Sequence, residues 1–344
     1  MKFSIFETIN NFLIINHISL LIILFLFPVI IIIVNNFCYN FKILDLPNER
    51  KLHKFPMPVS GGLVLFIFFV ITFFFKNIFD LNFKFFFTDI IFFSIIFFIL
   101  GLIDDLKKFD TKLKIVILLT AITLIVFFSS NYNLNFLRFK FIFDRTYILD
   151  YLSIPFTVFC IFMLFNALNY ADGKNGIAIS IGIYWIVYIF FKTNGEFFTL
   201  LEIALVLTIL LAFNLKKKLF LGNSGVSLLS VFISFLLIKT YNANIYNLYC
   251  DEIFLLLFIP GLDAARVTII RIINKTSPFE PDRKHLHHHL EKYIDEKLIW
   301  LVFLLLSISP IFILLISNNF IISIIIPLLI YSFLISSFWK KKHN

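Results

Sequence analysis

Long, nearly continuous apolar runs recur along the whole 344-residue chain and limit its fold more than any other feature. A helix needs about 20 mostly apolar residues to cross the hydrocarbon layer of a membrane. Only helices and closed barrels satisfy the backbone in lipid, and continuous runs rather than alternating ones favour helices. Because 60% of the residues are hydrophobic and only 15% are charged, an ordinary water-soluble globule is excluded. We therefore expect an all-α integral membrane protein.

The apolar runs predict about 10 to 11 transmembrane helices in one polytopic membrane domain over residues 1–344. The first run is too long for the apolar part of a cleaved signal peptide, so we expect it to remain as an anchor. The expected spans are residues 18–38, 61–75, 85–103, 113–129, 149–168, 176–191, 197–213, 225–240, 253–273, 299–316 and 320–339.

The distribution of positive charge predicts the orientation of the chain. With eleven spans, 22 of the 30 Lys and Arg residues lie on the side that holds residues 39–60, and 8 lie on the other side. Cytoplasmic loops of membrane proteins carry the excess of Lys and Arg. We therefore expect the C-terminus to be cytoplasmic and the N-terminus periplasmic. The net charge of +9 then reflects topology and lipid headgroups rather than a nucleic-acid site.

Five loops on the expected cytoplasmic side have compositions too specific for simple connectors. They lie at about residues 39–60, 101–114, 166–176, 214–225 and 274–298. The loops expected on the outer side hold nothing comparable. The charge count and the positions of these motifs depend on different residues, and they agree. We therefore expect one cytoplasm-facing site that several loops build together.

Asp104 and Asp105 end a predicted span at the membrane interface. Adjacent side chains on a helix diverge by about 100°, so one carboxylate can bind a divalent cation while the other binds a proton or a second partner. Oxygen ligands of this kind suit Mg²⁺. The alternative is that the two acids form a solvated cluster with the neighbouring lysines.

Asn166, Asn169 and Asp172 recur at intervals of three at the end of an apolar span and share roughly one helix face. Polar groups at that depth are costly unless they have partners, so this row predicts a functional site. Interhelical hydrogen bonding is the alternative. Glycines on both sides of Asn175 permit a tight turn directly after the row.

The last of the five loops is rich in histidine and in positive charge. A structural zinc site uses spaced ligands and usually Cys, and three consecutive histidines cannot all chelate one ion. Guanidinium, ammonium and imidazole groups donate hydrogen bonds to phosphate, so the loop indicates phosphate contact, with a metal site or a plain basic loop as alternatives. Its candidate residues are Arg283, His285, His287, His288 and His289.

Basic residues, oxygen ligands and a position at the inner leaflet together indicate a site for phosphate-bearing molecules. No Walker loop, G-x-G-x-x-G or G-x-S-x-G motif occurs, so the sequence shows no P-loop ATPase, Rossmann oxidoreductase or serine hydrolase. A transporter of lipid-linked sugars fits less well, because transporters usually place their polar groups near the bilayer midplane.

The five motifs, in this order over about residues 40–295, resemble those of the polyprenyl-phosphate N-acetylhexosamine-1-phosphate transferases of glycosyltransferase family 4. The last loop looks like the branch that uses GlcNAc or a related N-acetylhexosamine rather than the related phospho-MurNAc-pentapeptide transferase. The resemblance implies transfer of a sugar-1-phosphate from a UDP-sugar to undecaprenyl phosphate, with Mg²⁺ or Mn²⁺ and release of UMP. It also implies a bacterial cytoplasmic membrane enzyme that initiates O-antigen, lipopolysaccharide or another cell-envelope glycan. A homodimer is one assembly compatible with it.

The same resemblance assigns residue roles. It implies catalytic roles for Asp104, Asp105 and Asp172, which are also candidate Mg²⁺ ligands together with Asn223. It implies substrate-binding roles for Arg50, His53, Lys54, Asn166, Asn169, Asn175, Arg283, His285, His287, His288 and His289.

The chain departs from the family pattern at Asn223, where the family has an aspartate that binds the metal. An amide oxygen carries no charge, so metal affinity should fall unless the remaining carboxylates compensate. This departure supports an alternative function, in which a catalytically weakened paralogue binds polyprenyl phosphate or nucleotide-sugar as a scaffold.

Overall fold

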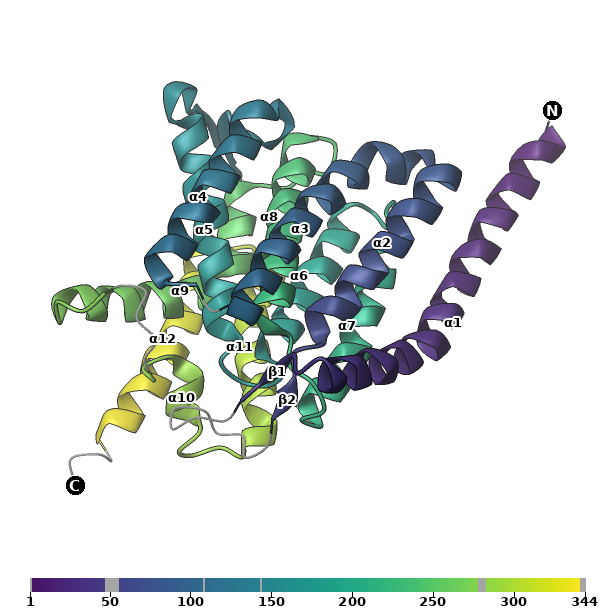
Figure 1. Ribbon diagram of the computed structural model, residues 1–344. Helices are drawn as coiled ribbons and strands as arrows, with labels where there is room; N and C mark the ends of the chain where they lie inside the picture. Colours follow the sequence, from purple (N-terminus) through teal and green to yellow (C-terminus); the bar gives the residue numbers. More distant parts are fainter. Residues whose placement is uncertain (1, 47–55, 108, 143, 278–282, 341–344) are drawn as a thin grey trace.

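The computed structural model describes residues 2–46, 56–107, 109–142, 144–277 and 283–340, and these residues are mostly helical (Figure 1). The helices are α1 Lys2–Asn40, α2 Gly61–Phe79, α3 Leu81–Lys107, α4 Thr111–Phe128, α5 Ser153–Ala171, α6 Ile177–Lys192, α7 Thr199–Leu215, α8 Gly222–Asn242, α9 Cys250–Ile273, α10 Leu286–Leu290, α11 Glu296–Ser317 and α12 Phe320–Lys340. Two short 3₁₀ turns, η1 Ser130–Tyr132 and η2 Asp150–Leu152, and four strands, β1 Leu44–Asp45, β2 Met57–Pro58, β3 Phe136–Phe139 and β4 Arg145–Ile148, complete the set.

The apolar runs form helices where the sequence predicts them. Within the described residues, each of the eleven expected spans coincides with a separate helix, namely α1 to α9, α11 and α12. Eight of these are long and apolar enough to cross a membrane by length and composition, whereas α6, α7 and the Phe320–Ser336 part of α12 are shorter apolar helices. The expectation of a multi-pass membrane protein is confirmed at this level.

The described residues are mostly helical, as expected for an all-α protein, and they also include two short antiparallel hairpins that the sequence did not predict. In the first hairpin Leu44 pairs with Pro58, and in the second Phe136 pairs with Ile148. Each hairpin is only two to four residues long per strand, and such hairpins are stable only when other elements support them. That support comes from distant residues: Phe220 N donates to Pro58 O at 2.9 Å, and Asp251 accepts from Lys140 N at 2.9 Å.

Helix α8 lies at the centre of the bundle, where it packs against α2, α3, α5 and α6. In its most apolar stretch, 94% of the residues are buried. Ser230 and Ser234 donate to carbonyls one turn earlier in the helix, so these small polar residues can be buried without a loss of hydrogen bonds. Small residues on a membrane helix let its neighbours approach closely.

The elements that carry the sequence motifs meet at one end of the bundle. Figure 1 shows the β1–β2 hairpin and α10 there, near the end at which α12 finishes, while α1 begins at the opposite end. Pro28 lies inside α1 and Pro260 inside α9. Proline removes a helical hydrogen bond and bends the helix, and both helices depart from the direction of the bundle in Figure 1.

Candidate functional site

Asp105 connects the end of α3 to the start of α8. Its two carboxylate oxygens accept hydrogen bonds from Asn223 N at 3.0 Å and Ser224 N at 2.9 Å. The first N–H groups of a helix have no partner within the helix and favour a negative charge. Asp105 therefore acts as an N-terminal cap for α8 that is supplied by another helix, and it fixes the loop that contains Asn223.

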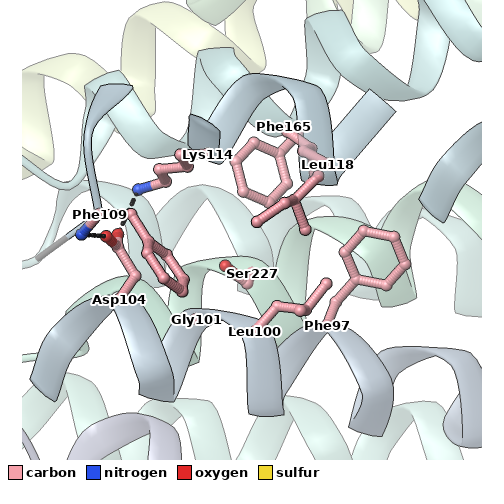
Figure 2. Close-up of a pocket in the computed structure, with 10 residues that line it drawn as sticks. Phe97, Leu100, Gly101, Asp104, Phe109, Lys114, Leu118, Phe165 and Ser227 are labelled. Atoms are coloured by element: carbon pink, nitrogen blue, oxygen red, sulfur yellow. Dashed lines mark hydrogen bonds and ion pairs between the residues drawn. The ribbon is translucent and has the colours of Figure 1, made fainter. Parts of the chain in front are cut away.

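Asp104 forms an ion pair with Lys114 from the first turn of α4 (Figure 2). Lys114 Nζ lies 2.7 Å from Asp104 Oδ2 and donates to Asn223 Oδ1 at 3.1 Å. The other oxygen of Asp104 accepts from Phe109 N at 3.0 Å. Thus the neutral amide at position 223 serves as an acceptor for a lysine.

A small cavity lies beside this ion pair and is mostly apolar. Figure 2 shows Phe97, Leu118 and Phe165 around it, with Asp104 and Lys114 at one end. One polar end and apolar walls suit an amphiphilic ligand better than a wholly polar one.

Glycines allow α2, α3 and α8 to approach closely at the site. A Cβ at Gly62 would lie 2.4 Å from Gly225 N, and a Cβ at Gly101 would lie 2.5 Å from Asn223 O. Real side chains do not tolerate such distances, so these two glycines are required for packing. Gly222 has a φ of +75°, a left-handed conformation that glycine adopts without strain.

The Asn166–Gly176 segment ends α5 and then turns sharply. Asn166 donates to Phe162 O at 2.8 Å, and Asp172 follows directly after the helix. The turn closes at Gly176, whose φ is +87° and whose N–H donates to Asn214 Oδ1 at 2.6 Å. The predicted tight turn is confirmed, and Asn214, which the sequence did not single out, holds it. Asn169 and Asn175 are half-buried.

Asp172 lies in an electrostatically unfavourable place for a carboxylate. Burial raises the pKa of this carboxyl well above its ordinary value, and the nearby carboxylates of Asp105 and Asp45 raise it further. The structure thus brings the acid pair and Asp172 into one region, with Asp45 at the end of β1 beside them.

The histidine motif forms the short helix α10 and lies against Asp263 of α9. His285 Nδ1 lies 2.8 Å from Asp263 Oδ2, and Leu286 N donates to Asp263 Oδ1 at 3.0 Å. Burial lowers the pKa of His287 well below its ordinary value and lowers that of His289 less, so the His287 ring is neutral near pH 7. A neutral imidazole still carries one N–H donor, so the contact of His287 with phosphate stays a prediction.

The Asp172 loop and the histidine motif are in direct contact. A Cβ at Gly173 would lie 2.7 Å from His287 Nε2. Lys174 pairs with Glu291, which also accepts from Arg283 at 3.3 Å and lies 3.5 Å from His288 Nδ1. These ion pairs tie residues 172–176 to the segment around α10. Burial lowers the pKa of Lys174.

Three of the predicted site residues lie where the structure gives no test, and two residues of the site were not predicted from the sequence. Arg50, His53 and Lys54 lie outside the described residues. The sequence reasoning overlooked Lys114 and Asp263. Asp263 carried a usable signal, because a carboxylate inside an apolar span is costly and is a functional candidate by default.

The donor set fits a magnesium ion only in part. Among the described residues, no group of three or more His, Cys, Asp or Glu is arranged to hold a metal. Mg²⁺ needs only one or two carboxylates when waters and substrate phosphates complete its shell. Asp105 and Asp172 would supply two carboxylates, and the charge of Asp105 disfavours that of Asp172, which a bound cation would offset. Asn223 fits poorly, because its oxygen already binds Lys114.

A bundle of apolar helices with acidic, amide and histidine groups gathered at one end defines a multi-pass membrane enzyme. The family model of glycosyl transferase family 4 matches residues 87–241 of the chain. The chain is 29% identical to a probable undecaprenyl-phosphate N-acetylglucosaminyl 1-phosphate transferase of Bacillus subtilis, over 86% of this chain and 82% of the relative.

Two further relatives cover similar lengths. An undecaprenyl-phosphate alpha-N-acetylglucosaminyl 1-phosphate transferase of Thermotoga maritima is 29% identical over 76% of this chain and 77% of its own. A phospho-N-acetylmuramoyl-pentapeptide-transferase of Dictyoglomus thermophilum is 26% identical over 73% of this chain and 80% of its own.

Proposed function

We propose that this protein transfers N-acetylhexosamine-1-phosphate from a UDP-sugar to undecaprenyl phosphate and releases UMP. The observation that carries the proposal is the meeting of Asp105, Asp172 and His287 at one end of an apolar bundle, in a chain related to enzymes named for this transfer. An oxygen of the lipid phosphate bonds to the β-phosphorus of the UDP-sugar. The bond between that phosphorus and the bridging oxygen breaks, and UMP leaves with the electron pair.

We assign one group of residues to the binding of the lipid phosphate and another group to the binding of the nucleotide-sugar. Lys114, held by Asp104, lies beside the apolar cavity and can donate to the lipid phosphate. Asp172 and the histidine motif face the donor, with Asn166, Asn169 and Asn175 as binding groups on the same segment. The basic residues Arg50, His53 and Lys54 are assigned to the nucleotide or its phosphates from the sequence motif alone. The attack is either direct or passes through a carboxylate intermediate.

The proposed cofactor is Mg²⁺, with Mn²⁺ as the alternative ion. When bound, the ion supplies charge neutralisation at the diphosphate. Asp105 and Asp172 are the residues that would hold it, and its charge would offset the burial and the neighbouring carboxylates that raise the pKa of Asp172.

We also propose the orientation and the biological setting. Eleven spans would place the N-terminus in the periplasm and the site at the cytoplasmic face of the bacterial inner membrane, because the site end carries most of the Lys and Arg residues. The product would initiate a cell-envelope glycan such as O-antigen. The proposed unit is a single polytopic domain over residues 1–344, and a homodimer is one possible assembly.

The test is an assay of purified protein with Mg²⁺, undecaprenyl phosphate and a panel of radiolabelled UDP-sugars. We expect a lipid-linked product and UMP with UDP-GlcNAc or another UDP-N-acetylhexosamine. Asp104→Ala, Asp105→Ala and Asp172→Ala should each abolish transfer without loss of protein. Normal rates in all three variants would contradict the assigned site.

The bond between Lys114 and Asn223 favours a second candidate, a weakened paralogue that binds one substrate as a scaffold. If no UDP-sugar gives a product with the natural protein, and Asn223→Asp restores transfer, this second function replaces the first.

A further inference from the structure

Asp263 is the acceptor for four hydrogen bonds from three different segments. Besides His285 and Leu286, Arg266 donates to its Oδ1 at 2.9 Å and the Tyr331 hydroxyl donates to the same oxygen at 2.7 Å. Arg266 also donates to Tyr331 Oη and to Lys284 O, both at 2.6 Å. Asp263, Arg266 and Tyr331 therefore form a closed network, named here the α9–α12 clamp, around the backbone that leads into the histidine motif.

The clamp fixes the orientation of the His285 ring. An ionised carboxylate only accepts hydrogen bonds, so the His285 nitrogen that faces Asp263, Nδ1, carries a proton. The opposite nitrogen, Nε2, is then held in one direction by a carboxylate that is itself held by Arg266 and Tyr331. Such an outer partner commonly fixes the tautomer and the ring direction of a functional histidine.

The fixed nitrogen belongs to a group of buried atoms that lack partners. His285 Nε2 and both ring nitrogens of His287 have no hydrogen-bond partner within the described residues. The two residues are 4% and 1% exposed, and their rings are parallel at 5.7 Å. A buried polar group without a partner costs about 1 to 3 kcal/mol. His287 Nε2 lies beside Gly173, and three such atoms together indicate that a ligand completes them.

We infer that Tyr331 and Arg266 are positioning residues, which act through Asp263 to aim His285 Nε2 at the bound donor. This inference rests on the proposed transferase function. Through Tyr331, the last helix, α12, would then contribute to the site, although α12 lies beyond the residues matched by the family model. Neither residue touches substrate itself, so each should affect the rate of transfer more than the binding of the lipid.

The first test is Tyr331→Phe, which removes one hydroxyl and keeps the ring. We expect kcat to fall about tenfold, with the KM for undecaprenyl phosphate unchanged. Ser332→Ala, an exposed neighbour on the same helix, is the matched control and should behave as the natural protein. Arg266→Gln provides a second variant if Tyr331→Phe does not fold. An unchanged kcat in the folded variants overturns the inference.

A double-mutant cycle separates positioning from general support of the fold. If Tyr331 acts through His285, then Tyr331→Phe should lower kcat by less than about twofold in a His285→Gln background, because the coupled group is already gone. A merely structural residue would lower kcat by the same factor in both backgrounds, and that additive result overturns the inference.

A chemical readout that needs no transferase activity completes the test. Diethylpyrocarbonate modifies accessible imidazole nitrogens, and mass spectrometry can follow its reaction at His285. Because the His285 ring is buried and held in the natural protein, we expect Tyr331→Phe to raise the modification rate of His285 at least threefold, while Ser332→Ala leaves it unchanged. If the natural protein transfers no sugar phosphate but this rate rises, the positioning of His285 by the clamp is supported and the proposed transferase function is contradicted. If transfer occurs and the rate at His285 is unchanged, only the positioning role of the clamp is contradicted.

Discussion

Asn223 sets the charge of the site, because its amide oxygen accepts from the lysine that also neutralises Asp104. With an aspartate at this position, Lys114 would lie between two carboxylates, and the site would gain one negative charge. Charged oxygen ligands bind Mg²⁺ more strongly than an amide oxygen. The asparagine should therefore appear first as weak binding of the metal, so that transfer by the natural protein needs a high Mg²⁺ concentration.

We predict that Asn223→Asp lowers the Mg²⁺ concentration for half-maximal transfer by about tenfold. The same variant should show a larger rise in melting temperature when Mg²⁺ is added, which thermal unfolding in detergent measures without any substrate. Asn244→Asp adds the same charge at an exposed position after α8 and should change neither quantity. A higher Mg²⁺ requirement in Asn223→Asp would contradict the prediction.

The buried carboxylate of Asp172 should lower the stability of the folded state when no ligand is bound. A carboxyl whose pKa is raised on folding binds protons more tightly in the folded state, so the folded state gains stability as pH falls and loses it as pH rises. Its carboxylate form is therefore least favourable at neutral pH, where burial and the neighbouring acids oppose it.

We predict that Asp172→Asn raises the melting temperature of the ligand-free protein by about 2 to 4 °C at neutral pH. The difference should shrink as pH falls toward about 4, the ordinary range of the carboxyl. Asp144→Asn, a change at an exposed position, is the matched control and should leave the melting temperature at neutral pH unchanged. A lower melting temperature for Asp172→Asn would show that the carboxylate stabilises the fold.

At the scale of elements, the N-terminal ends of α8 and α4 are each capped by an aspartate, but the two aspartates are connected to their helices differently. Asp105 caps α8 from another helix, whereas Asp110 caps its own helix, α4, by accepting from Lys112 N. Loss of an N-terminal cap costs about 0.5 to 2 kcal/mol. Comparing variants of Asp105 and Asp110 therefore distinguishes the loss of a helix cap from the loss of a role in the transfer reaction.

We predict that Asp105→Ala and Asp110→Ala lower the melting temperature by similar amounts, and that only Asp105→Ala abolishes transfer. Parallel measurements of thermal unfolding and of lipid-linked product check this outcome. If Asp110→Ala also abolished transfer, or if Asp105→Ala kept the natural rate, Asp105 would have no role beyond the cap.

The helices could be predicted from the sequence, but the short elements could not. Apolar runs fix the spans because lipid imposes a minimum length and forbids unpaired backbone groups. The β1–β2 hairpin has no such local cause, since part of its support is the hydrogen bond between Phe220 and Pro58. The helix α10 likewise depends on Asp263, which is about twenty residues earlier in the chain.

At the scale of the whole molecule, the sequence predicted that the motif residues gather at one end of the bundle, but not how their groups pair. The order of motifs and the alternation of spans placed Asp104, Asp172 and His285 together. The ion pair of Lys114 with Asp104 and the hydrogen bonds of Asp105 to the start of α8 depend on how helices far apart in the sequence pack. No periodicity or local motif encodes those contacts.

The orientation of the bundle in the membrane is the remaining property of the whole molecule, and exposed positions at its two ends can report it. Lys216 is exposed after α7 at the site end, whereas Ile245 is exposed after α8 at the other end. The 21 residues of α8 separate the ends, which corresponds to about 30 Å. Since most of the Lys and Arg residues belong to the site end, that end should face the cytoplasm.

We predict that, with Cys38, Cys160 and Cys250 replaced by serine, Ile245→Cys reacts with a membrane-impermeant maleimide in intact cells whose outer membrane has been made permeable. Lys216→Cys should react only after the inner membrane is also opened, because the reagent cannot reach the cytoplasm before then. The opposite pattern would place the site outside, where UDP-sugars are not supplied by the cytoplasm, and would contradict both the orientation and the use of a cytoplasmic donor.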